Sequence, residues 1–460
     1  MAYQSLNPFD GQILHTFEEL DDDALEQALA TADRCFASWR QTSFAERAGV
    51  LARAAAILRA RVDAFARPIT LEMGKLLVES RGEVALSADI LAYYAQHAEA
   101  FLAPQILTPA TGEAFIESTP LGVLFGIEPW NFPYYQLARF VAPNLMAGNV
   151  VLIKHASNVP QCAIAFAALF REAGAPVGAY TNLLISKSQV ARVIADPRIK
   201  GVALTGSEEA GAIVAGQAGQ ALKKSTLELG GSDAFIVLED ADLVETVRWA
   251  LWGRINNGGQ CCVASKRFIV VEAVADRFLE LFGAALGGLV TGDPMAEATT
   301  LAPLSSRQAL RNLVNQVDRS VAAGARLLMG GQAVPGLGAF MQPTILTDIA
   351  PDNPAYAEEF FGPVALFFRV ADEDAAVALA NDSSFGLGGA VFTADIARGK
   401  RVAGRLDTGM VFINHPTWTA ADLPFGGIKR SGYGRELSAL GIQEFVNKKL
   451  IRVAGLHDPA

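Results

Sequence analysis

Short apolar segments of strand length alternate with helix-forming segments between residues 150 and 238. The apolar segments are Val150–Lys154, Asn182–Ile185, Gly201–Thr205, Ser225–Glu228 and Ala234–Leu238. The segments 161–172 and 208–221 between them have the composition and apolar spacing of helices. Strands that alternate with helices form βαβ units. This stretch therefore predicts a mainly parallel sheet that binds its ligand beyond the carboxyl ends of its strands.

The same alternation returns over residues 264–430, after a helical segment at 242–255. The strands expected there are 267–271, 325–329, 361–368, 389–393 and 409–414, with helices at 275–286 and 306–322. A chain of 460 residues, 51% of them hydrophobic, has the material for such a second α/β domain. Residues 22–102 are predicted to be helical, with a capping box at Ser43–Glu46. The segment Lys449–Val453 has the pattern of an edge strand that needs a partner.

The charge balance argues against a nucleic-acid or anionic-membrane surface, because 38 basic and 48 acidic residues give a formal net charge of −10. We expect no signal peptide, and no uncharged apolar run reaches the ~18 residues of a membrane helix. Four cysteines, two of them adjacent, favour a reducing compartment and hence the cytoplasm. The five histidines show no metal-ligand spacing with the cysteines, so we expect no metal site.

A thiol nucleophile is the main chemical prediction from the residues alone. In Asn256–Cys262 a helix runs into two glycines and then two cysteines. Glycines on a turn let the backbone approach a ligand closely and leave a following side chain projecting into a cleft. The thiolate is the reactive form of cysteine, so Cys261 and Cys262 are candidate nucleophiles. The competing interpretation is that both are small buried hydrophobic residues.

Two other turns between a strand and a helix carry polar groups. Glu128–Pro133 precedes a helix expected at 134–146, so the Asn131 amide is free to point outward from the turn. Thr205–Ser207 opens a helix directly after a strand, where free backbone N–H groups favour a phosphate, and Lys154 at the end of its strand is a suitable cation. The simpler alternatives are an ordinary turn and a solvated strand end.

A series of short motifs follows along the chain in a fixed order. They are Pro129–Pro133, Thr205–Ser207, Glu228–Gly231, Gly259–Cys262, Glu358–Pro363, Pro424–Gly427 and Ser431–Glu436. In order and spacing they resemble the aldehyde dehydrogenase superfamily, from Asn7 to the last strand. The resemblance implies a Rossmann-like parallel-sheet cofactor domain (1–102 and 122–229), an α/β catalytic domain (230–430) and a small oligomerisation β-segment (103–121 and 444–460). It also implies a homodimer or homotetramer.

The resemblance implies a covalent route for the oxidation of an aldehyde. The family's nucleophile lies two positions after the glutamine, which makes it Cys262 and leaves Cys261 as a neighbour. The Asn131 side-chain amide and the Cys262 backbone N–H would hold the oxyanion. Glu228, followed by two glycines that allow it to move, matches the carboxylate that activates water against the thioester. Glu436 is a second candidate for that base.

The resemblance also implies a nicotinamide cofactor, NAD or NADP. The residues that would bind it are Trp130, Lys154, Ser157, Gly206, Ser207, Glu359 and Phe361. Lys154 would face the adenosine ribose or its phosphate, Gly206 and Ser207 the pyrophosphate, and Glu359 the nicotinamide ribose. Ser157 stands where NAD-preferring members often carry a glutamate. A carboxylate repels a 2′-phosphate whereas a hydroxyl can donate to it, so we expect NADP to be usable.

Within the family, Lys154–Val159 and Glu228–Ile236 resemble the succinate-semialdehyde dehydrogenase branch in its shorter form. That likeness implies oxidation of a small aldehyde, succinate semialdehyde, to the carboxylic acid. Arg139 matches the arginine that binds the substrate carboxylate in that branch. The branch's second arginine is absent, because Asn256 stands at its position.

Three other functions are compatible with the same motifs. One is a dehydrogenase of broad specificity or for another semialdehyde. A second is a CoA-acylating enzyme, although such members generally lack the glutamate at the position of Glu228. The third is a non-catalytic protein on the same scaffold, against which the intact Asn131, Glu228 and Cys262 argue.

Overall fold

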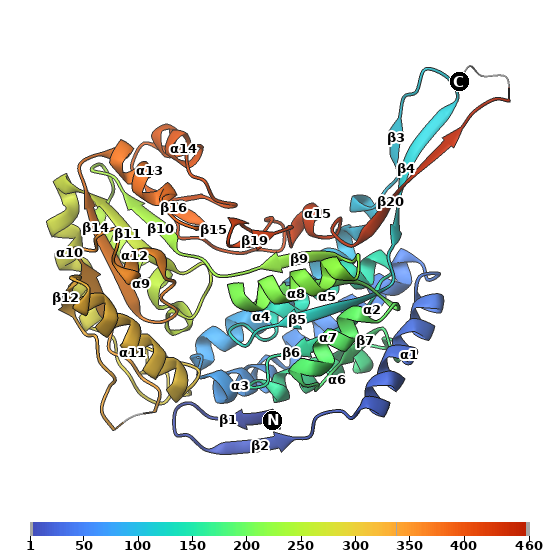
Figure 1. Cartoon of the computed structure of the whole chain (residues 1–460), viewed down its shortest axis with the longest axis horizontal. Coiled ribbons are helices and arrows are strands. Elements are labelled where there is room, and N and C mark those ends of the chain that lie inside the picture. Colours follow the sequence, from blue (N-terminus) through green and yellow to red (C-terminus); the bar gives the residue numbers. More distant parts are fainter. Residues whose placement is uncertain (1–2, 337, 457–460) are drawn as a thin grey trace.

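Two lobes, each built around a β-sheet, and a projecting arm make up the molecule (Figure 1). The structure, a computed structural model, describes residues 3–336 and 338–456. Helices cover the sheets, and most of the hydrophobic core lies between the helices and the strands they cover. The α/β fold class predicted from the sequence is confirmed.

The first lobe has a six-stranded sheet of order β19-β9-β8-β5-β6-β7, parallel except for the pair of β19 with β9. Its strands are β5 (Val123–Glu128), β6 (Val150–His155), β7 (Tyr180–Asn182), β8 (Ile199–Thr205), β9 (Lys224–Glu228) and β19 (Gly432–Tyr433). The helices of this lobe are α1 (Asp22–Trp39), α2 (Phe44–Ala60), α3 (Val62–Met73), α4 (Leu77–Phe101), α5 (Tyr135–Ala147), α6 (Pro160–Glu172), α7 (Lys187–Ala195) and α8 (Glu208–Gln220).

The second lobe has a seven-stranded sheet of order β12-β13-β14-β11-β10-β16-β17, in which β12 alone is antiparallel. Its strands are β10 (Asp233–Val237), β11 (Ser265–Val271), β12 (Arg326–Met329), β13 (Thr344–Thr347), β14 (Val364–Val370), β16 (Gly389–Phe392) and β17 (Phe412–Ile413). Its helices are α9 (Leu243–Ile255), α10 (Glu272–Gly287), α11 (Arg307–Ala322), α12 (Pro354–Ala357), α13 (Glu373–Asn381) and α14 (Ile396–Ala403).

The arm is an antiparallel sheet of order β20-β4-β3 that projects from the first lobe (Figure 1). It consists of β3 (Gln105–Leu107), β4 (Glu113–Pro120) and β20 (Val446–Val453). The predicted C-terminal edge strand thus finds its partner within the chain, because β20 pairs with β4 along its whole length. The smaller elements are β1 (Tyr3–Leu6), β2 (Ile13–Phe17), β15 (Phe385–Gly386), β18 (Ile428–Lys429) and α15 (Ser438–Gly441).

Local sequence signals place several helix ends. Ser43 and Glu46 form the predicted capping box at the start of α2. Gly148 ends α5 with φ 92°, a left-handed conformation that glycine adopts without the steric cost other residues meet. Every residue of α5 is buried, so this helix is held on all sides by protein. Among the residues that the structure describes, no helix is long and apolar enough to cross a membrane.

Two strands differ from the sequence prediction. The strand expected at 182–185 is β7, which ends at Asn182. Leu183 N–H still donates to Ile153 O of β6 (2.7 Å), but the next two carbonyls accept from N-terminal residues. Leu20 N–H donates to Leu184 O (2.8 Å) and Tyr3 Oη donates to Ile185 O (2.8 Å). The strand expected at 409–414 shrinks to β17. Its first residues bond to the 386–387 segment rather than to β16.

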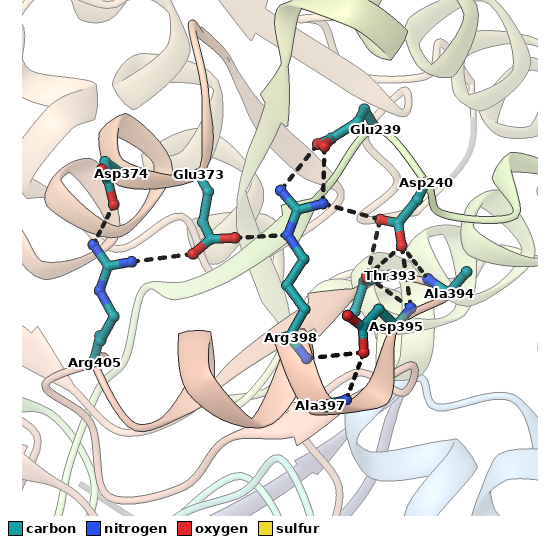
Figure 2. Close-up of polar contacts among 10 residues, drawn as sticks. All are labelled: Glu239, Asp240, Glu373, Asp374, Thr393, Ala394, Asp395, Ala397, Arg398 and Arg405. Carbon is teal, nitrogen blue, oxygen red and sulfur yellow. Dashed lines mark hydrogen bonds and ion pairs between the residues drawn. The ribbon is translucent and has the colours of Figure 1, made fainter.

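Ion pairs join the loops at the carboxyl end of the second sheet (Figure 2). The Arg398 guanidinium contacts Glu239 (2.8 Å) and Glu373 (2.7 Å), while Arg405 contacts Glu373 (3.1 Å). Asp240 accepts hydrogen bonds from Thr393 and from two backbone N–H groups that follow it. This network ties together the segments that follow β10, β14 and β16. The cysteines lie at the other end of the sheet, before β11 begins.

Candidate active site

The loop that carries Cys262 is set by an unusual backbone and two buried side chains. Asn257, Gly258 and Gly259 all have positive φ (54°, 62° and 79°), a run that the two glycines make possible. Arg254 donates to Gly259 O (2.7 Å), and the Gln260 amide bonds to Asn257 O (3.1 Å) and Ser305 N (2.8 Å). The glycine turn predicted from the sequence thus holds the cysteines between the two lobes.

The Cys262 side chain lies where two cavities meet. One cavity of about 290 Å³ is lined by Trp130, Asn131, Gly206, Ser207, Glu228, Cys262, Glu359 and Phe361, so eight predicted site residues come together there. An adjoining cavity of about 50 Å³ is lined by Arg139, Asn256 and both cysteines. Cys262 faces both cavities and Cys261 only the second. This difference separates two thiols that are neighbours in sequence.

Asn131 is more constrained than the sequence suggested. Its side chain is only 4% exposed, and its amide nitrogen donates to Gln260 O (3.1 Å) rather than standing free. One of its two N–H donors remains for the cavity. Gln136 contacts Asn131 Oδ1 (2.8 Å), and Asn257 donates to Asn131 O (2.8 Å). Gln136, the second residue of α5, was missed by the sequence reasoning.

The two neighbouring thiols influence each other, and their pKa values move in opposite directions. The hydrogen bond with Cys261 and burial raise the pKa of the Cys262 thiol, while Arg139 and Lys266 lower it. The same hydrogen bond lowers the pKa of Cys261. The first proton therefore leaves from the pair, and the remaining thiol stabilises the thiolate.

Glu228 ends β9 at the edge of the larger cavity. Its side chain is 4% exposed, and both carboxyl oxygens lack a hydrogen-bond partner among the described residues. Burial raises the pKa of this carboxyl well above its usual range, against the opposing effect of Arg139. A raised pKa makes the ionised carboxylate a stronger base, which suits the role of general base.

Arg139 is the centre of a buried charged cluster. Its guanidinium, 1% exposed, forms an ion pair with Glu436, and it also donates to Tyr135 Oη (3.2 Å) and Thr205 Oγ1 (3.1 Å). Burial raises the pKa of the Glu436 carboxyl, and Arg139 opposes that rise. Glu436, the second candidate base, lines neither cavity. The structure therefore brings Glu228, and not Glu436, to the nucleophile's cavity.

The cofactor-side residues form one wall of the larger cavity. Ser207 caps α8 by accepting from Ala210 N–H, so the N-terminus of that helix opens toward the cavity. The rings of Trp130 and Phe361 meet edge to face at 5.8 Å. Glu359 accepts a hydrogen bond from Gly231 N–H (3.1 Å). An open helix N-terminus beside apolar rings suits the phosphates and nicotinamide of a dinucleotide.

Lys154 and Ser157 lie at the carboxyl end of β6, outside the two cavities. Lys154 is opposite Ile127 of β5 in the ladder, and Ser157 is exposed two residues beyond the strand. Burial lowers the pKa of Lys154, and the nearby charge of Lys187 lowers it further. Lys154 thus has a second cation nearby, and the Glu19 carboxylate opposes its effect on the pKa. Lys187, at the start of α7, was not singled out from the sequence.

The chain belongs to the aldehyde dehydrogenase family, whose model matches residues 1–451. Among its relatives is the NADP(+) succinate-semialdehyde dehydrogenase of Deinococcus radiodurans, 53% identical over 98% of this chain and 94% of that protein. A probable NADP(+) succinate-semialdehyde dehydrogenase of Synechocystis is 46% identical over 99% of this chain and 100% of that protein. Succinic semialdehyde dehydrogenase from Streptococcus pyogenes, solved with NADP+ as the cofactor, superposes with a TM-score of 0.97 at 46% identity, covering 99% of this chain and 100% of that one.

Proposed function

We propose that this aldehyde dehydrogenase oxidises succinate semialdehyde to succinate with NADP. One observation carries the proposal: Cys262 lies where a cavity suited to a dinucleotide meets a cavity that contains Arg139. The names and cofactor of the relatives at 45–53% identity support the substrate and NADP. The Arg139 experiment described below tests the substrate.

Acylation begins with attack of the Cys262 thiolate on the aldehyde carbon. The oxygen then becomes an oxyanion, which the free N–H of the Asn131 amide and the Cys262 backbone N–H stabilise. The fixed position of Asn131, held through Gln260 and Gln136, keeps its donor in place before the charge develops. Trp130, Ser207 and Glu359 would hold a nicotinamide cofactor in the larger cavity, where it would supply the acceptor for the hydride that leaves the carbon bonded to Cys262. The product on the enzyme is a thioester of Cys262.

Deacylation needs a water molecule activated beside the thioester. Glu228 reaches the same cavity as Cys262, and its raised pKa makes its carboxylate a stronger base toward water. Gly230 and Gly231 follow it, and a side chain at Gly230 would collide with Glu359. The absence of a side chain at Gly230 therefore leaves room for Glu228 and Glu359 to line the same cavity.

The substrate carboxylate is proposed to bind on the Arg139 side of the small cavity. The Glu436 ion pair neutralises much of the Arg139 charge, so additional donors are needed. The Tyr135 hydroxyl contacts both Arg139 (3.2 Å) and Thr419 Oγ1 (2.8 Å) and lines that cavity, as does the Asn256 amide. Arg139 and these neutral groups together would take the place of two arginines.

Replacing Arg139 by leucine should reduce recognition of the distal carboxylate. A hydrogen bond to a charged group contributes about 2 kcal/mol, so kcat/KM for succinate semialdehyde should fall about 30-fold relative to butanal. The measurement is the ratio of kcat/KM for succinate semialdehyde to kcat/KM for butanal. A ratio is needed because the loss of Arg139 also leaves Glu228 and Glu436 without their counter-charge, which slows the oxidation of both aldehydes. A ratio equal to that of the unmodified enzyme would mean that Arg139 serves only the buried cluster.

Ser157→Glu should shift the cofactor preference toward NAD. A carboxylate close to the 2′-phosphate costs about 1–2 kcal/mol, so KM for NADP should rise about tenfold while KM for NAD changes little or falls. Steady-state kinetics with both cofactors measure the effect. Ala298→Glu, which adds the same charge at an exposed position outside both cavities, is the matched control. Unchanged affinity for NADP in Ser157→Glu would show that this residue does not face the adenosine ribose.

We further propose the domain roles and an oligomer. Residues 1–102 and 122–229 would bind the cofactor, 230–430 would carry the catalytic cysteine, and 103–121 with 444–460 would join subunits. The arm supports this, because the outer edge of β20 has no strand beside it among the described residues, and Ile106 and Leu450 are 74% and 61% exposed. A homodimer or homotetramer would cover them. The four free cysteines suit a reducing compartment such as the cytoplasm.

A further inference from the structure

Lys266 is a buried cation that the mechanism above does not use. It is the second residue of β11, four residues after Cys262, and its side chain is 0% exposed. A buried ammonium needs an acceptor for each of its three N–H groups and a counter-charge, since desolvation of the ion is costly. Its contacts therefore show what it holds in place.

The three contacts of the Lys266 ammonium join two parts of the site. It donates to Cys261 O (2.9 Å) and Cys262 O (2.8 Å), the carbonyls of the nucleophile and its neighbour. Its third contact is Glu359 Oε1 (3.0 Å), an ion pair with the carboxylate assigned above to the nicotinamide ribose. One side chain thus links the thiol loop to the cofactor wall.

We propose that Lys266 is a positioning residue that couples the placement of the Cys262 loop to the Glu359 carboxylate. The proposal rests on the roles given above to Cys262 and Glu359. It assigns two separable tasks to one ammonium. Toward Cys262, the cation fixes the carbonyls of the loop and favours the thiolate. Toward Glu359, it holds the carboxylate against the cavity wall, where Gly231 N–H is the second donor (3.1 Å).

The charges around the thiol agree with the first task. Cys261 faces the Cys262 thiol, and Arg139 and Lys266 are the cations that lower its pKa. Arg139 is paired with Glu436 and lies near the further carboxyls of Glu128 and Glu228. Lys266 has one ion-pair partner among the described residues, Glu359, and one more carboxyl nearby, Asp233. Arg139 has the larger effect of the two cations, and Lys266, with fewer carboxyls around it, adds a second positive charge that favours the thiolate.

The test measures the thiol without substrate or cofactor. We expect Lys266→Met to move the pH midpoint of Cys262 alkylation by iodoacetamide upward by about one unit, and to slow alkylation at pH 7 about tenfold. Mass spectrometry assigns the alkylated residue to Cys262 or Cys261. Lys266→Gln keeps an amide donor but no charge. Lys266→Gln should show the same shift in the pH midpoint of Cys262 alkylation, and it replaces the methionine variant if that variant does not fold. An unchanged midpoint in the folded variant would overturn the first task.

Arg267→Met is the matched control for loss of a buried cation from the same strand. Arg267 is 4% exposed and donates to Ser232, Leu379 and Ala380 carbonyls, away from the thiol. We expect it to lower thermal stability without moving the alkylation midpoint. An equal shift in this control would mean that the thiol responds to general loosening of the lobe.

The second task predicts a dependence on Glu359. Lys266→Met should raise the NADP dissociation constant, measured by fluorescence quenching, about tenfold in the unmodified background and by less than twofold in the Glu359→Gln background. The alkylation shift should persist in both backgrounds. Equal effects on NADP affinity in the two backgrounds would overturn the coupling. If Cys262 alkylation left aldehyde oxidation intact, the proposed function itself would fail, and that result is independent of Lys266.

Discussion

Cys262→Ala is expected to abolish aldehyde oxidation and any ester hydrolysis, with a loss of roughly 10⁴- to 10⁶-fold in kcat, the scale for removal of a catalytic nucleophile. The reason is geometric. Cys262 faces both the cofactor-side and the substrate-side cavity, so its sulfur alone can attack an aldehyde that also faces the nicotinamide. Steady-state rates with succinate semialdehyde and p-nitrophenyl acetate measure the two activities.

Cys261→Ala is the comparison that makes this result informative. Cys261 lines only the substrate-side cavity, so most of each activity should survive its loss. The hydrogen bond between the two thiols raises the pKa of Cys262, and without it the pH–activity profile should extend to lower pH. Comparable losses of activity in the two variants would contradict the assignment of Cys262 as the nucleophile and indicate that both thiols are required.

The parts of the fold that sequence reasoning located are those governed by local signals. The capping box at Ser43 and the helix expected at 134–146, which Gly148 ends, depend on contacts within a few residues, and both were predicted. The prediction of a strand at 182–185 was wrong at its end, because the carbonyl of Ile185 accepts a hydrogen bond from Tyr3 instead of from a neighbouring strand. That contact spans 182 residues of sequence, and no periodicity in a short segment can indicate it.

The candidate site also contains residues that sequence motifs located and residues whose contacts only the folded structure reveals. Motif positions brought eight predicted residues to one cavity, from Trp130 to Phe361. The sequence could not show that Arg139 is paired with Glu436, because the two lie 297 residues apart and meet only in the folded lobe. Lys266 was missed for a related reason. It sits in an apolar strand, where a lysine carries no motif signal, and its function follows only from the carbonyls and carboxylate around it.

The general base is tested by separating the two halves of the reaction. Among the described residues, Glu228 and Glu359 are the two carboxyls that line the larger cavity with Cys262, and Glu359 is paired with Lys266. Glu228→Gln removes the unpaired one. Acylation does not need Glu228, so the first turnover should proceed. Hydrolysis of the thioester should slow by roughly 10²- to 10⁴-fold, the usual contribution of a general base. Stopped-flow absorbance should then show a burst of NADPH, close to one per active site, before a slow steady rate.

The pH dependence of steady turnover provides a second test of Glu228 as the general base. Burial raises the pKa of Glu228, so at low pH the carboxyl is protonated and cannot accept a proton from water. Steady turnover limited by hydrolysis should therefore rise as pH increases through that raised pKa, and Glu228→Gln should lose this limb while its burst remains. Glu436→Gln is the matched comparison, because it removes a second buried carboxyl paired with Arg139 that lines neither cavity. A burst followed by a slow rate in Glu436→Gln alone would transfer the role of base to Glu436. The absence of a burst in Glu228→Gln would show that Glu228 acts before hydride transfer, by activating the Cys262 thiol.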